Sequence, residues 1–88
     1  MKGIKRKFAD VFELPSEAVY ALPVLTVTGR IEVIVENYEG VIEYSPEIIR
    51  LGTSAGTLKI EGLEMDIKCM NSQCVKVTGQ IDSFFYEA

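Results

Sequence analysis

The sequence predicts an all-β protein, in which a small antiparallel meander curls into a sandwich or partial barrel. Apolar and polar residues alternate almost without interruption over residues 24–36, which is the pattern of a half-buried strand. The same period of two recurs over residues 63–69 and 75–81. The chain has 88 residues, enough for one small domain with a marginal core that oligomerisation commonly supplements.

The first 22 residues, which we call the N-terminal arm, differ from the predicted β-domain of residues 23–88. Apolar side chains of the arm fall at the i, i+4, i+7 and i+8 positions of one helix face. They are Ile4, Phe8, Val11 and Phe12. Leu14-Pro15 is expected to end this helix, because the residue before a proline avoids the helical conformation. The arm is therefore predicted to be a short amphipathic helical segment.

Three hairpin turns are predicted in the β-domain, because hairpin partners must present the same face of the sheet. The turns are Tyr38-Glu39, Ser54-Ala55 and Glu61-Gly62. They would pair Val35 with Ile42, Leu51 with Leu58, and Ile60 with Leu63. All three hairpins keep one apolar face, and this agreement favours a meander.

Four glycines are predicted to shape the chain. Gly40 and Gly62 belong to predicted turns, whereas Gly29 and Gly79 hold equivalent places in a faint repeat and predict bends within long strands. A short β-solenoid is the alternative fold, since Gly29, Gly40, Gly52 and Gly62 follow one another at intervals of 11, 12 and 10 residues.

The two cysteines allow two registers. A two-residue loop would place Cys69 opposite Cys74, within possible disulfide reach. A three-residue loop of residues 71–73 would instead pair Cys69 with Val75 and keep Val75 and Val77 on the apolar face. Burial of the two valines favours the second register, which leaves the cysteines on opposite faces.

The composition argues against several functions. The first seven residues carry four positive charges, whereas the remainder carries five basic and thirteen acidic residues, so the β-domain is a poor partner for nucleic acid. Histidine is absent, which removes the commonest general base and metal ligand. The acidic side chains read as the solvated face of a sheet, interspersed with lysine and arginine. We therefore expect no enzyme activity, metal, cofactor or small-molecule substrate.

Two features of the sequence are candidates for binding. Four large apolar residues occupy outward positions and predict a surface for self-association or for a partner protein: Ile34, Val41, Phe84 and Tyr86. The second candidate is the arm, with its cations Lys2, Lys5, Arg6 and Lys7 beside the apolar positions. This arm would either contact an anionic membrane surface peripherally or pack over an edge or face of the sheet.

Short motifs in a fixed order resemble the YabP/YqfC family of sporulation proteins, more specifically its YqfC branch. They are Phe12-Glu13-Leu14-Pro15, Leu22-Pro23, Thr28-Gly29, Glu36-Asn37-Tyr38-Glu39-Gly40, Ile60-Glu61-Gly62-Leu63 and Gly79-Gln80-Ile81. The resemblance implies a role in endospore formation in Firmicutes, in the mother cell, and brings no catalytic residue, cofactor or substrate. We expect a cytoplasmic, non-catalytic structural or interaction protein that forms homo-oligomers or binds another sporulation protein. A peripheral membrane-docking module is the alternative.

Overall fold

The computed structural model of the chain describes residues 22–87 and contains six strands. They are β1 (Val24–Thr28), β2 (Glu32–Glu36), β3 (Tyr38–Tyr44), β4 (Ile48–Thr53), β5 (Gly56–Met70) and β6 (Cys74–Tyr86). All neighbouring strands are antiparallel, in the order β1-β2-β6-β5-β4-β3. The all-β prediction is confirmed, and the β-solenoid is wrong, because coils of a solenoid pair in parallel. The helix predicted in the arm lies outside the described residues.

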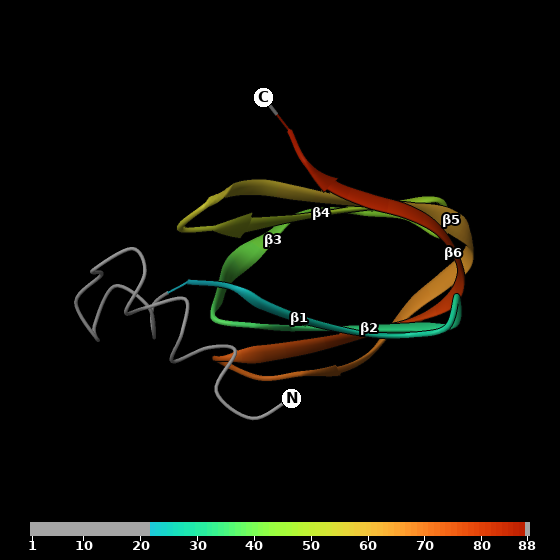
Figure 1. Cartoon of the computed structure of the whole chain (residues 1–88), viewed down its shortest axis with the longest axis horizontal. Helices are drawn as coiled ribbons and strands as arrows, with labels where there is room; N and C mark the ends of the chain where they lie inside the picture. Colours follow the sequence, from blue (N-terminus) through green and yellow to red (C-terminus); the bar gives the residue numbers. More distant parts are fainter. Residues whose placement is uncertain (1–21, 88) are drawn as a thin grey trace, which may run out of the picture.

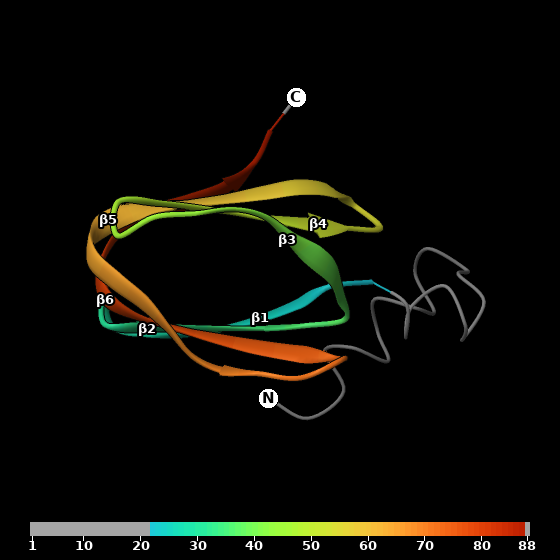
Figure 2. The ribbon, with the colours of Figure 1, turned by 180° about the vertical axis from the view of Figure 1, so that it is seen from behind.

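The single open sheet folds over on itself into two layers (Figures 1 and 2). One layer contains β1, β2 and the halves of β5 and β6 that meet at their connecting loop. The other contains β3, β4 and the remaining halves of β5 and β6. The hydrophobic core consists of buried residues between the layers: Val33, Val35, Ile49, Leu51, Leu58, Ile60, Met65, Val75, Val77 and Ile81. This arrangement confirms the predicted curling of the sheet.

Both long strands pass from one layer to the other at a corner formed by Gly62, Glu64 and Gly79. A Cβ at Gly62 would collide with the backbone oxygen of Gln80. A Cβ at Gly79 would lie 2.7 Å from the backbone oxygen of Glu64 and from Cα of Met65. Gly79 has φ +141° and Glu64 has φ +52°, beside an irregularity in the β5–β6 register. The bend predicted at Gly79 is confirmed, because only glycine allows the two backbones to approach so closely.

The turn predicted at Glu61-Gly62 is wrong, since both residues lie within β5. Gly62 is buried and serves the close approach of β5 and β6 at the corner. A tight turn and a close backbone contact both favour glycine, which is why the sequence did not separate them.

The connections on either side of β2 also differ from prediction. Residues 24–36 form a hairpin that turns at Gly29, with φ +50°, rather than one bent strand. Val35 pairs with Leu25 and Val75 and not with Ile42, because the chain leaves its layer after β2. Asn37, with φ +64°, marks this crossing, and its N–H donates to the Gln73 carbonyl at 2.7 Å. The predicted β2–β3 hairpin is therefore wrong, and Gly40 lies inside β3.

The β4–β5 hairpin confirms the predicted turn at Ser54-Ala55. Leu51 pairs with Leu58 and Ile49 with Ile60, as expected from their shared apolar face. The Thr53 hydroxyl donates to the Gly56 carbonyl at 2.6 Å and accepts the Ala55 N–H at 3.1 Å. These contacts hold the turn between two buried strands.

The loop between β5 and β6 has the predicted three residues, 71–73. The Asn71 carboxamide oxygen accepts the N–H groups of Gln73 and Cys74, each at 2.8 Å. The predicted pairing of Cys69 with Val75 is wrong by one residue: Cys69 lies opposite Lys76, because the register shifts between Ile67 and Cys69. Both cysteines are free thiols, and Val75 is buried as predicted.

Candidate interaction surface

Two strand edges remain unpaired on the side of the molecule that Figure 1 presents. β1 pairs with β2 alone, and residues 81–86 of β6 pair with β5 alone. We call these two edges, residues 24–28 of β1 and 81–86 of β6, the β1–β6 seam. Because they belong to different layers, the seam is an opening at the side of the sandwich.

The seam is closed at one end, where the β1–β2 turn meets the corner of β6. The N–H of Ile81 donates to the Arg30 carbonyl at 2.7 Å, and the N–H of Gly79 donates to the Ile31 carbonyl at 3.1 Å. The Arg30 guanidinium donates to the Ile81 carbonyl and to an Asp82 carboxylate oxygen, both at 3.3 Å. From this end the two edges run apart toward the start of β1 and the end of β6.

Aromatic and aliphatic side chains on the core-facing side of the seam are incompletely covered. Directly opposed residues in antiparallel strands share a face. Val27 pairs with buried Val33, and Phe84 and Tyr86 pair with buried Ile60 and Leu58. Yet Val27, Phe84 and Tyr86 remain 41%, 41% and 43% exposed, because an edge strand has a neighbour on one side only.

This placement corrects the predicted surface. Phe84 and Tyr86 face inward, because a register irregularity after Ile81 reverses the alternation of β6. Val41 pairs with buried Leu51 and also faces inward, at the opposite side of the sandwich, whereas Ile34 lies on the outer face between Thr26 and Lys76. The four predicted residues therefore do not form one surface. Val27 was missed because its alternation predicted a core position.

The opposite opening, between β3 and residues 66–70 of β5, is bridged by tyrosine hydroxyls. Tyr44 donates to the Asp66 carboxylate at 2.6 Å, and Tyr38 donates to the Asn71 carbonyl at 2.6 Å. The bond to Asp66 raises the pKa of Tyr44. The same bond, together with the Lys68 ammonium at 3.2 Å, lowers the pKa of Asp66. This side of the sandwich is thus tied together by polar contacts between its layers.

The edges of the β1–β6 seam also lack the protection that sheet edges usually carry. β1 contains no charged residue and no proline, and neither do residues 83–86, whereas Asp82 and the register irregularity beside it protect only the closed end of the β6 edge. Charges, prolines and bulges on edge strands prevent pairing with other chains. The β1–β6 seam is therefore the part of the described structure best suited to bind a further protein segment.

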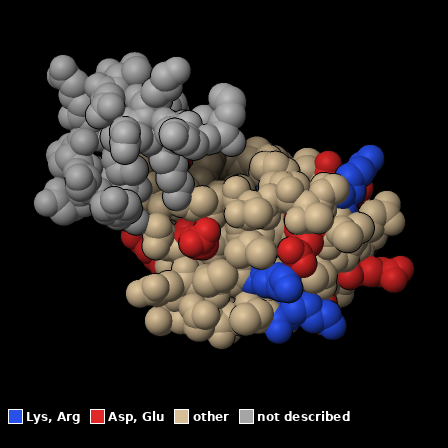
Figure 3. Space-filling view, turned by 60° about the horizontal axis from the view of Figure 1, so that its bottom comes forward, with Lys and Arg blue, Asp and Glu red and all other residues tan. Residues whose placement is uncertain are grey.

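Ion pairs cover the outer face of the layer that contains β3 and β4. Arg50 bonds to carboxylate oxygens of Glu43 and Glu87, and the Lys59 ammonium lies 3.2 Å from Glu61. The hydrogen bonds from Lys59 and then from Ser83 lower the pKa of Glu61. These contacts agree with the interpretation of the acidic side chains as part of the solvated face of the sheet. Figure 3 presents the other side of the molecule, with the layer of β1 and β2, and there too charges of both signs lie among uncharged side chains.

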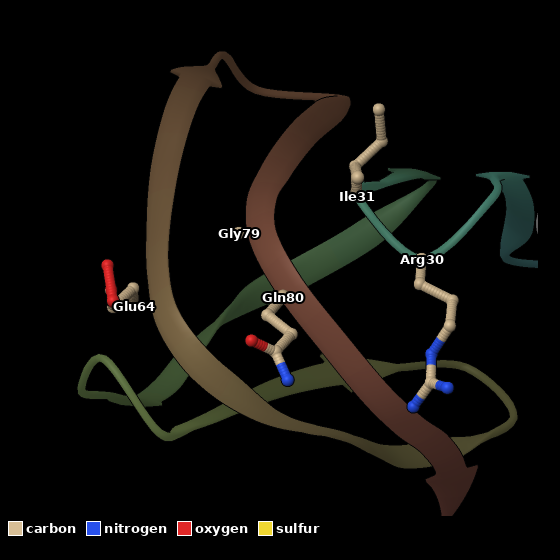
Figure 4. Close-up of a pocket in the computed structure, with 5 residues that line it drawn as sticks. All are labelled: Arg30, Ile31, Glu64, Gly79 and Gln80. Atoms are coloured by element: carbon tan, nitrogen blue, oxygen red, sulfur yellow. The ribbon is translucent and has the colours of Figure 1, made fainter.

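A shallow hollow lies at the corner of β5 and β6 (Figure 4). Its lining residues are Arg30, Ile31, Glu64, Gly79 and Gln80. Arg30 already binds Asp82, and the side chains of Arg30 and Glu64 lie apart on either side of β6. Within residues 22–87, no group of three His, Cys, Asp or Glu side chains could hold a metal ion. The same residues contain no helix long and apolar enough to cross a membrane.

Comparison with known proteins places this fold in a family. The family model described as the YabP family matches residues 22–88, which includes the entire β-domain. The chain belongs to the YabP family. It is also 30% identical over 83 residues to the uncharacterized protein YqfC of Bacillus subtilis strain 168, covering 94% of this chain and 89% of that protein. Because at most five residues of the chain fall outside this YqfC match, the similarity extends into the N-terminal arm.

Proposed function

We propose that this YabP family member is a non-catalytic interaction protein of endospore formation, and that it binds another protein chain at the β1–β6 seam. The bound chain is either a second copy or another sporulation protein. One observation carries the proposal: Val27, Phe84 and Tyr86 face the core from two unprotected edges and remain exposed. Family membership supports the link to sporulation.

The seam offers two kinds of binding energy. Its edge N–H and C=O groups would accept an added strand, which supplies main-chain hydrogen bonds. Covering its apolar side chains would contribute about 25 cal/mol for each Å² removed from water. Aromatic residues at an otherwise incomplete core are typical anchors of protein interfaces.

Phe84 and Phe85 provide a matched pair of variants to test this function. They are neighbours on one strand, 41% and 44% exposed, and they lie on opposite faces. Phe84→Thr is expected to reduce the count of heat-resistant spores by at least tenfold, and Phe85→Thr is expected to leave it unchanged. Circular dichroism would first establish that both variants fold. Normal spore counts for folded Phe84→Thr would contradict the proposal.

Light scattering over a range of concentrations separates the two kinds of bound chain. A mass that rises with concentration, and that Phe84→Thr returns to the monomer value, would identify a second copy. A constant monomer mass, both for the intact chain and for one lacking residues 1–13, combined with the loss of spores in Phe84→Thr, would identify a different sporulation protein.

We propose the mother-cell cytoplasm as the site of action, from the family resemblance. The cluster of Lys2, Lys5, Arg6 and Lys7 favours peripheral membrane contact as a second candidate function. Flotation with anionic vesicles tests it: the intact chain should float, and a variant with these four residues replaced by serine should not. Equal flotation of the two chains would contradict membrane contact through the arm.

A further inference from the structure

We propose that the N-terminal arm of the same chain binds in the β1–β6 seam through Ile4, Phe8, Val11 and Phe12. The arm would then cover the surface at which a partner chain binds and would have to leave before assembly. This competition rests on the proposed function, whereas binding of the arm to the seam does not.

The arm joins the described structure at the open end of the seam. The Asn37 side-chain amide donates to the Leu22 carbonyl at 2.9 Å, two residues before β1 begins. The ten residues 13–22 span up to about 35 Å when extended. The five residues of β1 measure only about 17 Å. The predicted helix can therefore reach every part of the seam.

The apolar stripe of the arm is short enough to lie within the seam. Positions 4 to 12 of a helix cover about 12 Å along its axis. Residues 81–86 of β6 extend over about 20 Å. Four apolar side chains on one helix face would contact Val27, Phe84 and Tyr86 and bury the parts of these side chains that are now exposed.

The charges of the two parts are complementary. The arm carries four cations within its first seven residues and three carboxylates after them, a net charge of +1, whereas residues 22–87 contain five basic and ten acidic side chains, a net charge of −5. Glu36, which pairs with Val24 on the outer face beside the start of β1, forms no ion pair with any described residue.

Covalent attachment favours the arm over a separate molecule. A tethered segment experiences an effective concentration in the millimolar range. A second copy, at micromolar concentration, would need a much higher intrinsic affinity to displace it. The arm is therefore the expected occupant of the seam in the isolated protein.

A spin label on the full-length chain tests this placement. Ala9 lies beside the apolar stripe, so we would label Ala9→Cys after replacing Cys69 and Cys74 with serine. We expect the label to broaden the NMR amide signals of Val27, Phe84 and Tyr86 much more strongly than those of Val41 and Met70 at the opposite opening. Adding Phe8→Ser and Phe12→Ser should abolish the broadening, whereas the control Glu13→Ser should preserve it.

Three results would overturn the inference. The first is equal broadening at both openings, and the second is broadening that survives the loss of both phenylalanines. The third is broadening that disappears when labelled protein is diluted with unlabelled protein, because a second copy would then be the occupant. Spore counts keep the two proposals apart: normal spores in Phe84→Thr would contradict the proposed function even when the arm is found in the seam.

Discussion

Replacing Gly79 with alanine is expected to remove a large part of the stability of the fold. The backbone at φ +141° is a conformation that residues with a side chain rarely adopt, and enforcing it costs about 1–3 kcal/mol. The new Cβ would also lie 2.7 Å from backbone atoms of Glu64 and Met65, which cannot rotate away. Such overpacking adds about 1–3 kcal/mol.

Backbone strain and overpacking together lower the free energy of unfolding by about 4 kcal/mol, a large fraction of the roughly 5–15 kcal/mol that stabilises a domain. In a domain of this size, a loss of about 1 kcal/mol in the free energy of unfolding lowers the midpoint of thermal unfolding by roughly 4–8 °C. The Tm of Gly79→Ala should therefore fall by about 16 °C or more. Urea unfolding and thermal melting, both followed by circular dichroism, measure the change.

Gly40→Ala is the matched control for Gly79→Ala. Gly40 also lies within a strand, but its φ is ordinary, and no other atom lies within 4 Å of the position of its Cβ. Alanine there should be neutral or stabilise the fold by up to about 1 kcal/mol, because it restricts the unfolded chain. A loss below about 1 kcal/mol for Gly79→Ala would refute the assignment of the corner to a close backbone contact.

Two further predictions concern the bridged opening and the cysteines. The folded-state pKa of Asp66 lies below its unfolded value, so its contribution to stability is complete above the unfolded pKa and is lost as pH falls through the folded one. Tyr44→Phe should therefore raise the pKa of Asp66 in an NMR titration and make the stability less dependent on pH in the acid range. An unchanged titration would show that the hydroxyl contact does not form. Replacing Cys69 and Cys74 together by serine should alter the free energy of unfolding by less than about 0.5 kcal/mol, because both are free and neither is in the core. Thiol titration of the purified wild-type chain should find two reactive groups, and a Cys69–Cys74 disulfide would contradict the register.

The alternation of the sequence predicted the core well. Every buried core residue occupies a position whose parity was assigned inward, including Val33, Ile60 and Val77. The same parity failed for Ile31 and Leu63, which are exposed. Ile31 lies in the turn before β2, and Leu63 lies at the corner of β5, where the register shifts. A period of two holds only while the strand stays regular.

Strand partners were less predictable than faces. The side chain of Val35 lies on the apolar face whether Val35 pairs with Ile42 or with Val75, because all three residues are apolar. The predicted local turn favoured Ile42. The structure pairs it with Val75, 40 residues away, after Asn37 carries the chain into the other layer. Nothing in a local pattern specifies such a distant partner.

The candidate surface depended on the same irregularities. Aromatic residues at the end of β6 were recognised as unusual, and Phe84 and Tyr86 are indeed exposed. Their face was assigned wrongly, because one extra residue near Asp82 inverts the alternation after Ile81. Which edges lie open follows from the strand order, and that order depends on the distant pairing of β2 with β6.

The central place of β6 has a consequence for synthesis of the protein. β6 lies between β2 and β5, although it is translated after all the other described strands. Until it emerges from the ribosome, the β1–β2 hairpin has no link through the sheet to β3, β4 and β5. The nascent chain therefore contains two separate partial sheets, the β1–β2 hairpin and β3–β4–β5, whose apolar faces are exposed. Chaperones and proteases both recognise such exposed apolar surface. Folding is completed by the strand made last, and a stop codon before Cys74 would leave fragments for degradation rather than a shortened working protein.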